Sequence, residues 1–216
     1  FEPLTEERIE TDSTYDAGTT TQLMWGARSD VGCVRPHNED SYLVQSPLFC
    51  VCDGMGGHAA GEVASSIAVE TIAKTAPQSA DAARLAAAVE AANAAVIEAA
   101  LNGLGKPGMG CTATCAYIEN DTLAIAHVGD SRAYLLHEGT LIRVTRDHSY
   151  VEELVDAGEI TADEARVHPN RSVITRALGS DPAMYADHFT LHIEEGDRLI
   201  LCSDGLSSMI PDSDIE

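Results

Sequence analysis

The chain has 216 residues, enough for one domain with a full hydrophobic core. Its 35 acidic residues against 13 basic ones exclude a general nucleic-acid surface and docking on anionic membranes, because both need clustered Lys and Arg. No apolar run approaches the roughly 18 residues of a membrane span, and no signal peptide is visible.

The six cysteines lie mostly inside apolar, strand-like runs, and none forms a CxxC pair. This pattern is typical of small core residues in a reduced protein rather than of a disulfide framework. We therefore expect a cytoplasmic monomer with no nucleic-acid partner and no membrane insertion.

The first half of the chain predicts a leader, strands and two helices. Residues 1–20 are acidic and polar, which is typical of a solvated leader or linker. Strands are predicted over 22–27 and 41–45, and the apolar run 48–52 reads as a strand buried on both faces. Helices are predicted over 62–76 and, more clearly, over 80–101, where Asn102 and Gly103 end the pattern.

The second half begins with apolar alternation of period two. It predicts a meander of antiparallel strands over 112–118, 122–128, 132–137 and 140–144. A helix over 149–158 follows, and a second begins at Thr161, where Glu164 completes a capping box. Residues 172–178 are ambiguous, and 188–193 with 198–203 are predicted to form a final hairpin. The order of elements predicts an α/β (α+β) sandwich with mainly antiparallel strands covered by helices.

One sequence pattern occurs three times: an apolar strand ends in a small residue, and an aspartate follows. These residues are Asp53, Asp130 and Asp204, and Glu39 with Asp40 form an adjacent acidic pair. One such acid alone is most often a helix cap or turn residue. If the strand ends converge, the carboxylates repel one another unless divalent ions neutralise them. Hard oxygen ligands without zinc-type His or Cys spacing favour Mg²⁺ or Mn²⁺.

The glycines after Asp53 admit other interpretations with less support. Gly54, Gly56 and Ala59 fit a GxGxxA dinucleotide pattern, but no second strand carrying a ribose-binding acid follows. A phosphate-binding loop of the nucleotide hydrolases lacks its Gly-Lys-Ser or Gly-Lys-Thr. Ser131 lacks the GxSxG context of a nucleophilic serine.

Six ordered motifs over about residues 22–216 resemble those of the protein phosphatase 2C family, metal-dependent serine/threonine phosphatases, and in particular its bacterial branch. They are VRPHNEDS (34–41), CDGMGGHAAGEVAS (52–65), HVGDSRAYL (127–135), TRDHSYVEELVDAGEIT (145–161), VITRALG (173–179) and LCSDGLS (201–207). The resemblance implies a catalytic domain over 21–216 with a four-layer α-β-β-α sandwich and a metal centre at one end of its two sheets. It also implies a flap over 147–171 beside the site.

The resemblance implies a role for individual residues. Asp53 would bridge two Mn²⁺ or Mg²⁺ ions, with Glu39 and the Gly54 carbonyl on one ion and Asp204 on the other. Asp130, with Asp204, matches the position that binds a third ion in bacterial members. Asp40 would orient metal-bound water. Arg35 would hold the substrate phosphate with its planar fork of donors.

The implied reaction is hydrolysis of phosphoserine and phosphothreonine in proteins. Two divalent ions roughly 4 Å apart lower the pKa of a shared water, and the resulting hydroxide attacks phosphorus in line. His58 is a candidate general acid, although a structural role is as well supported and metal-bound water is a further proton source. The implied partners are phosphorylated proteins, with a serine/threonine kinase and its substrates expected at the level of the family.

One motif of the family has no counterpart in this chain. A Gly-Gly-x-Asp-Asn strand end, which supplies a further metal carboxylate, is expected after Asp204, but no Asp-Asn pair occurs up to Glu216. We therefore expect the last ligand and one central strand, the C-terminal part of the domain, to be missing from this sequence. This keeps a second hypothesis open, in which the chain is a catalytically impaired, phosphatase-like binding or regulatory module.

Overall fold

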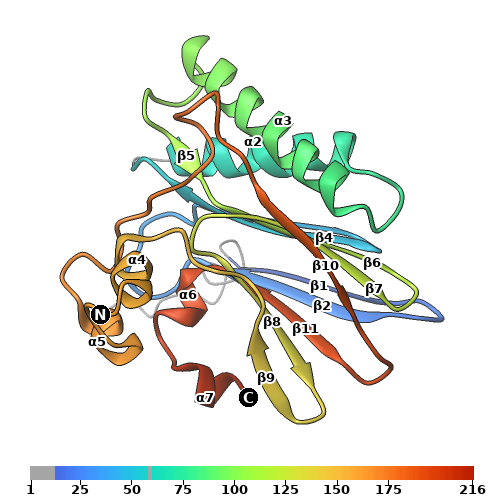
Figure 1. Ribbon diagram of the computed structural model, residues 1–216. Coiled ribbons are helices and arrows are strands. Elements are labelled where there is room, and N and C mark those ends of the chain that lie inside the picture. Colours follow the sequence, from blue (N-terminus) through green and yellow to red (C-terminus); the bar gives the residue numbers. More distant parts are fainter. Residues whose placement is uncertain (1–12, 58–59) are drawn as a thin grey trace, which may run out of the picture.

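The larger of two β layers is an antiparallel sheet with the strand order β10-β7-β6-β4-β3 (Figure 1). The structure is a computed structural model that describes residues 13–57 and 60–216. A short strand, β5, also pairs with β4. The strands of this layer are β3 (Asp40–Gln45), β4 (Leu48–Met55), β5 (Gly110–Cys111), β6 (Ala113–Glu119), β7 (Thr122–Val128) and β10 (Asp187–His192).

The second β layer consists of a hairpin and a three-stranded sheet of order β11-β8-β9. The indole of Trp25 meets the ring of Phe49 edge to face, with centroids 6.3 Å apart, so the hairpin packs on the larger sheet. The strands of this layer are β1 (Ser13–Thr19), β2 (Met24–Asp30), β8 (Arg132–His137), β9 (Thr140–Arg143) and β11 (Arg198–Cys202).

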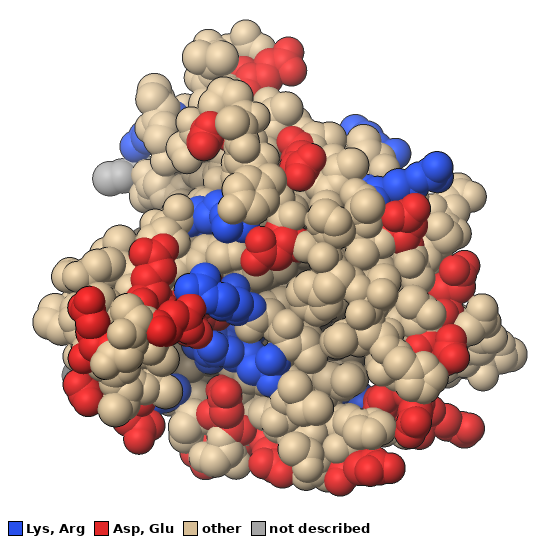
Figure 2. Space-filling model, viewed as in Figure 1, with Lys and Arg blue, Asp and Glu red and all other residues tan. Residues whose placement is uncertain are grey.

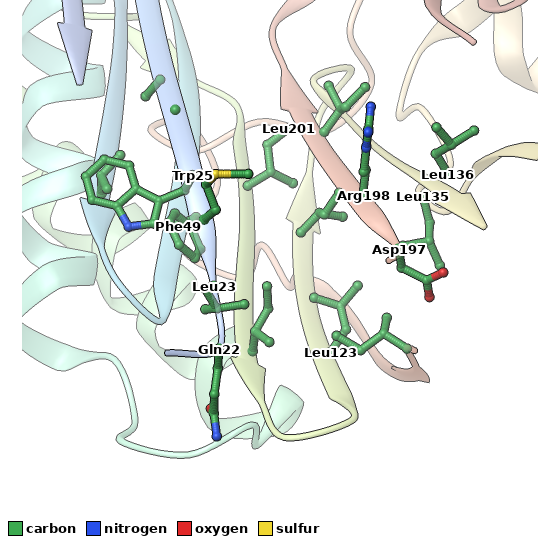
Figure 3. A pocket seen from close by; sticks show the side chains of 18 of the residues that line it. Gln22, Leu23, Trp25, Phe49, Leu123, Leu135, Leu136, Asp197, Arg198 and Leu201 are labelled. Atoms are coloured by element: carbon green, nitrogen blue, oxygen red, sulfur yellow. The ribbon is translucent and has the colours of Figure 1, made fainter. Parts of the chain in front are cut away.

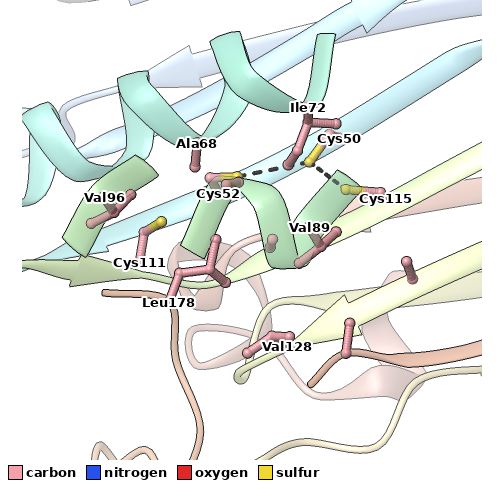
Figure 4. Close-up of a cluster of buried hydrophobic side chains, with 14 of the residues drawn as sticks. Cys50, Cys52, Ala68, Ile72, Val89, Val96, Cys111, Cys115, Val128 and Leu178 are labelled. Carbon is pink, nitrogen blue, oxygen red and sulfur yellow. Dashed lines mark hydrogen bonds between the residues drawn. The ribbon is translucent and has the colours of Figure 1, made fainter. Parts of the chain in front are cut away.

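Two long helices, α2 (Ala60–Thr75) and α3 (Ala82–Leu101), cover the outer face of the larger sheet (Figure 1). Their small residues and Ile72 pack on the strands, and the core between them includes four buried thiols (Figure 4). Cys50 lies opposite Cys115 on the neighbouring strand, with 2.8 Å between the sulfurs. All six cysteines are free and five are buried, as predicted.

Four short helices complete the described chain: α4 (Tyr150–Asp156), α5 (Ala162–Val167), α6 (Asp204–Ser207) and α7 (Asp212–Ile215). Thr161 caps α5, because the Glu164 amide donates to Thr161 Oγ1 over 3.1 Å. The Glu164 carboxylate accepts from the Thr161 hydroxyl over 3.2 Å, so the described contacts show one half of the predicted capping box. At the start of α7, Asp212 accepts a hydrogen bond from the Tyr134 hydroxyl on β8, which holds this helix against the second layer. No helix in the described part of the chain is long and apolar enough to span a membrane.

The predicted element types are largely correct, but three predictions about the strands are wrong. The segments 188–193 and 198–203 do not form a hairpin, because β10 pairs with β7 and β11 pairs with β8 in the other layer. The predicted meander is broken for the same reason, since the chain changes layers between β7 and β8. Part of the predicted leader, Ser13–Thr19, is strand β1, which pairs with β2 along its whole length. Residues 1–12 of that leader lie outside the described residues.

Candidate metal centre

The acidic residues converge at one end of the two β layers. Asp53 near the end of β4 lies directly opposite Asp40, the first residue of β3. Asp204 begins α6 immediately after β11. Asp130 lies in the connection between β7 and β8, where the chain changes layers. The three strand-end acids therefore come from both layers, as their repetition in the sequence predicted.

Backbone hydrogen bonds to Thr112 fix the position of Asp53. The amide of Asp53 donates to Thr112 Oγ1 over 2.9 Å, and the amide of Thr112 donates to the Asp53 carbonyl over 2.9 Å. The hydroxyls of Thr112 and Ser131 lie 2.6 Å apart. One threonine thus connects the end of β4 with the connection that carries Asp130.

Asp40 joins the two layers through a side-chain contact. Ser203, which precedes Asp204, donates its hydroxyl proton to Asp40 Oδ2 over 2.8 Å. This bond holds the start of α6 against the start of β3. Asp40 is therefore placed by both its strand register and a serine from the other layer.

Glu39 and Gly54 pack closely against the start of α2. The Gly54 amide donates to the Glu39 carbonyl over 3.1 Å. A Cβ on Gly54 would lie 2.5 Å from that same carbonyl oxygen and would also overlap the carbonyl of Gly61. Only glycine fits this contact, which explains one of the glycines after Asp53 without invoking a nucleotide.

The electrostatics of the site disfavour its carboxylates in their ionised form. Burial raises the pKa of Asp53 to about 9, and the charges of Asp40 and Asp204 act in the same direction. Burial also raises the pKa of Asp130 to about 7, with Asp204 and Asp147 adding to the effect. The pKa of Asp40 is raised by burial too, although the Ser203 hydrogen bond opposes this.

Two carboxylate oxygens of the site are buried without a hydrogen-bond partner among the described residues, Glu39 Oε1 and Asp130 Oδ1. Buried polar atoms of this kind are rare and call for an explanation. Divalent cations would pair with these oxygens and offset the mutual repulsion of the acids. The donor set consists of carboxylates, and thus fits Mg²⁺ or Mn²⁺ rather than a soft metal.

Arg35 is an exposed residue in the loop before β3. Its charge is close enough to Asp40 to oppose the rise in the pKa of that carboxyl. Arg35 makes no ion pair with any residue that the structure describes. The remaining candidate, His58, lies outside the described residues.

A large cavity in the described part of the chain lies away from these acids. It has a volume of about 1040 Å³ and lies between the two β layers, where Trp25 and Phe49 line one side and Leu135 and Leu201 the other (Figure 3). None of the five site acids lines it. This cavity is therefore separate from the candidate metal centre.

Ion pairs attach the segment 147–171 to the rest of the protein. Arg132 binds Asp147 through two nitrogens, at 3.0 and 2.7 Å, and both side chains are largely buried. Arg143 pairs with Glu152 of α4 at 2.8 Å. Acidic side chains are spread over the visible face, and basic ones gather beside α4 (Figure 2).

Sequence reasoning did not identify Thr112 or Ser203 as site residues. Ser203 has a local signal, because it is the small residue that precedes the third strand-end aspartate. Thr112 has none, because its contacts join segments that are 59 and 19 residues apart. Both residues position acids that the sequence did identify.

This chain belongs to the protein phosphatase 2C family, whose sequence profile matches residues 25–215. It is 43% identical over 205 residues to the serine/threonine protein phosphatase PstP of Mycobacterium tuberculosis, covering 92% of this chain but only 39% of PstP. It is 38% identical to the serine/threonine phosphatase stp of Listeria welshimeri, covering 88% of this chain and 80% of stp.

Solved structures agree with this assignment. The M. tuberculosis PstP structure matches with a TM-score of 0.79 and 38% identity, covering 94% of this chain and 83% of that one. A structure of the PstP catalytic domain in complex with two manganese ions matches with a TM-score of 0.77 and 37% identity, over the same shares. Stp1 of Staphylococcus aureus matches with a TM-score of 0.77 and 31% identity, covering 94% of this chain and 80% of that one.

Proposed function

We propose that this chain is a Mn²⁺- or Mg²⁺-dependent protein phosphatase that hydrolyses phosphoserine and phosphothreonine. The observation that carries the proposal is the convergence of Asp40, Asp53, Asp130 and Asp204 from both β layers. Beside them, Glu39 Oε1 and Asp130 Oδ1 are buried without a hydrogen-bond partner among the described residues. The names of the relatives support the same reaction. Phosphorylated proteins, including a serine/threonine kinase and its substrates, are the partners we infer.

Each acid has a separate task in this proposal. Asp53 would be shared between two cations, Glu39 and the Gly54 carbonyl would hold one of them, and Asp204 the other. Asp130 with Asp204 would hold a third. When bound, such ions supply a hydroxide for in-line attack on phosphorus and neutralise the phosphoryl oxygens.

The other residues bind and orient. Arg35 presents a fork of donors toward solvent, suited to two oxygens of a phosphate. Asp40, held by the hydrogen bond from Ser203, would orient water at the start of β3 by accepting a hydrogen bond from it. His58 would protonate the leaving serine or threonine oxygen, a role that His58→Asn tests through the pH dependence of kcat.

Hydrolysis of p-nitrophenyl phosphate and of a phosphothreonine peptide, with Mn²⁺ or with EDTA, tests the proposal. We expect turnover with Mn²⁺ only, and a loss of at least about 100-fold in Asp53→Asn, because even residues that only orient metal ligands are worth that much. The matched control is Asp121→Asn, a carboxylate that is 69% exposed in a turn, and it should retain the wild-type rate. An unchanged rate in Asp53→Asn would falsify the mechanism.

The second candidate function is that of a phosphatase-like binding module. One observation favours it: strands β2 and β11 both line the large cavity, and no described strand lies between them to carry the further metal carboxylate expected after Asp204. Phosphopeptide and Mn²⁺ binding without turnover would favour the module. Turnover in a chimera extended beyond Glu216 with the corresponding segment of the Listeria relative, but not in the present chain, would identify the missing ligand as the cause.

A further inference from the structure

The connection Gly129–Ser131, which carries Asp130, is held on one side by Thr112. Gly129 has φ = +106°, and a Cβ there would lie 2.5 Å from Thr112 Cγ2. The Ser131 hydroxyl lies 2.6 Å from that of Thr112. The connection is therefore fixed in place from the direction of Asp53.

On its other side the connection is held by His148. The Gly129 amide donates to His148 Nδ1 over 3.0 Å, and the His148 amide donates to the Gly129 carbonyl over 2.8 Å. Both backbone polar groups of Gly129 are thus paired with His148. The imidazole is only 2% exposed, so these bonds are shielded from water.

The second ring nitrogen of His148 is paired with Asp187 on β10. His148 Nε2 lies 2.7 Å from Asp187 Oδ2, and Arg176 donates to Asp187 Oδ1 over 2.7 Å. Because Nδ1 accepts from Gly129, the ring proton must be on Nε2, where it is donated to Asp187. Burial lowers the pKa of His148, which keeps the ring neutral and its Nδ1 free to accept.

We propose that His148 is a positioning residue that holds Asp130 in place for a divalent cation by pairing with Gly129, in the tautomer selected by Asp187. This inference rests on the proposed function. It also connects the start of the segment 147–171 to the metal centre, since His148 belongs to that segment. A carboxylate that orients an imidazole is a recurrent arrangement around metal sites, although here the imidazole holds a backbone amide instead of the metal.

Two substitutions separate this role from that of an ordinary core histidine. In His148→Asn the side-chain oxygen takes the position of Nδ1 and can still accept from Gly129, but Asp187 loses its donor. In His148→Gln the amide reaches Asp187, but Gly129 loses its acceptor. His127→Gln is the matched control: its imidazole stacks on His148 with centroids 5.0 Å apart and is equally buried, but it bonds to Thr114 and Arg146.

The measurement is titration of the protein with Mn²⁺ alone, with free Mn²⁺ followed by electron paramagnetic resonance. Comparison of the wild-type protein with Asp130→Asn shows which of the bound Mn²⁺ ions depends on Asp130. We expect His148→Gln to weaken the binding of that ion by about 10-fold or more. His148→Asn and His127→Gln should weaken its binding by less than about 3-fold. Equal weakening in all three imidazole variants, or none in His148→Gln, overturns the inference.

A second measurement needs no variant. In the metal-free wild-type protein the Gly129 amide should exchange with solvent deuterium as slowly as the amides of β7, and fast exchange overturns the inference. Failure of the wild-type protein to bind any Mn²⁺ would overturn the proposed function and this inference together. Normal Mn²⁺ binding with an unaffected His148→Gln overturns the inference alone.

Discussion

The pairing of Arg132 with Asp147 is a quantitative test of how the segment 147–171 is anchored. Asp147→Asn preserves the shape of the side chain and removes its charge, leaving Arg132 only 17% exposed and without its bidentate partner. Breaking a buried ion pair from one side costs about 3–5 kcal/mol. Asp147 also raises the pKa of Asp130, so losing its charge relieves some repulsion, and we expect the lower half of that range.

Thermal denaturation followed by circular dichroism, in EDTA so that metal binding does not contribute, measures the loss. At about 2–4 °C per kcal/mol for a chain of this size, the melting temperature should fall by roughly 6–16 °C. The control is Asp30→Asn, which removes an ion pair in which Asp30 is 45% and Arg28 70% exposed; because water screens such a pair, the melting temperature should fall far less. A loss below about 1 kcal/mol in Asp147→Asn, or one equal to the control, would refute the reasoning.

Three further predictions concern the site and the second layer. Gly54→Ala should lower stability by several kcal/mol and abolish Mn²⁺ binding, because its Cβ would lie 2.5 Å from the Glu39 carbonyl oxygen. Gly26→Ala, where the Cβ would meet only the Asp16 carbonyl oxygen at 3.8 Å, controls for the loss of glycine in calorimetry. The hydrogen bond to Asp197 raises the pKa of His137, so the stability that His137 contributes relative to His137→Asn should be full below pH ~6.5 and lost as the pH rises through the raised value. Denaturant titrations at pH 5.5 and 9 check this, and a difference that grows with pH contradicts it. Mn²⁺ at 100 times its dissociation constant should stabilise the protein by about 2.7 kcal/mol per independent site, and thermal scans that do not respond to Mn²⁺ or EDTA argue against a metal centre.

The local sequence pattern was sufficient to predict most helices and strands, but it did not predict which strands pair with one another. The Ala-rich helix was predicted to within two residues at its start and ends at Leu101 as predicted, because its apolar stripe and Asn102 act locally. The partners of β10 and β11 depend on the chain crossing between layers at residues 194–197, and alternation of period two does not encode which sheet a strand joins. Strand β1 is polar and was missed because pairing with β2 outweighs its composition.

The part of the site that could be predicted is the part marked by a repeated sequence pattern, an aspartate at the end of an apolar strand. Asp53, Asp130 and Asp204 share one local arrangement, and the structure brings them to one end of the molecule. What holds them there was not predictable, because Thr112 and His148 act through contacts that are distant in sequence. Their residue types are also common in cores, so no local signal distinguishes them.

The alternating burial pattern of strand β4 disfavours a shifted pairing of this strand with its neighbours. Its residues alternate strictly, so that Leu48, Cys50, Cys52 and Gly54 are buried while the residues between them, including Asp53, are less so. A slip of one residue against β3 or β6 would exchange the two faces. The carboxylate of Asp53 would then enter the thiol-lined core beneath the helices, where an unpaired charge costs several kcal/mol. The acid that we propose for cation binding thus also penalises misregistered folding, before any metal is bound.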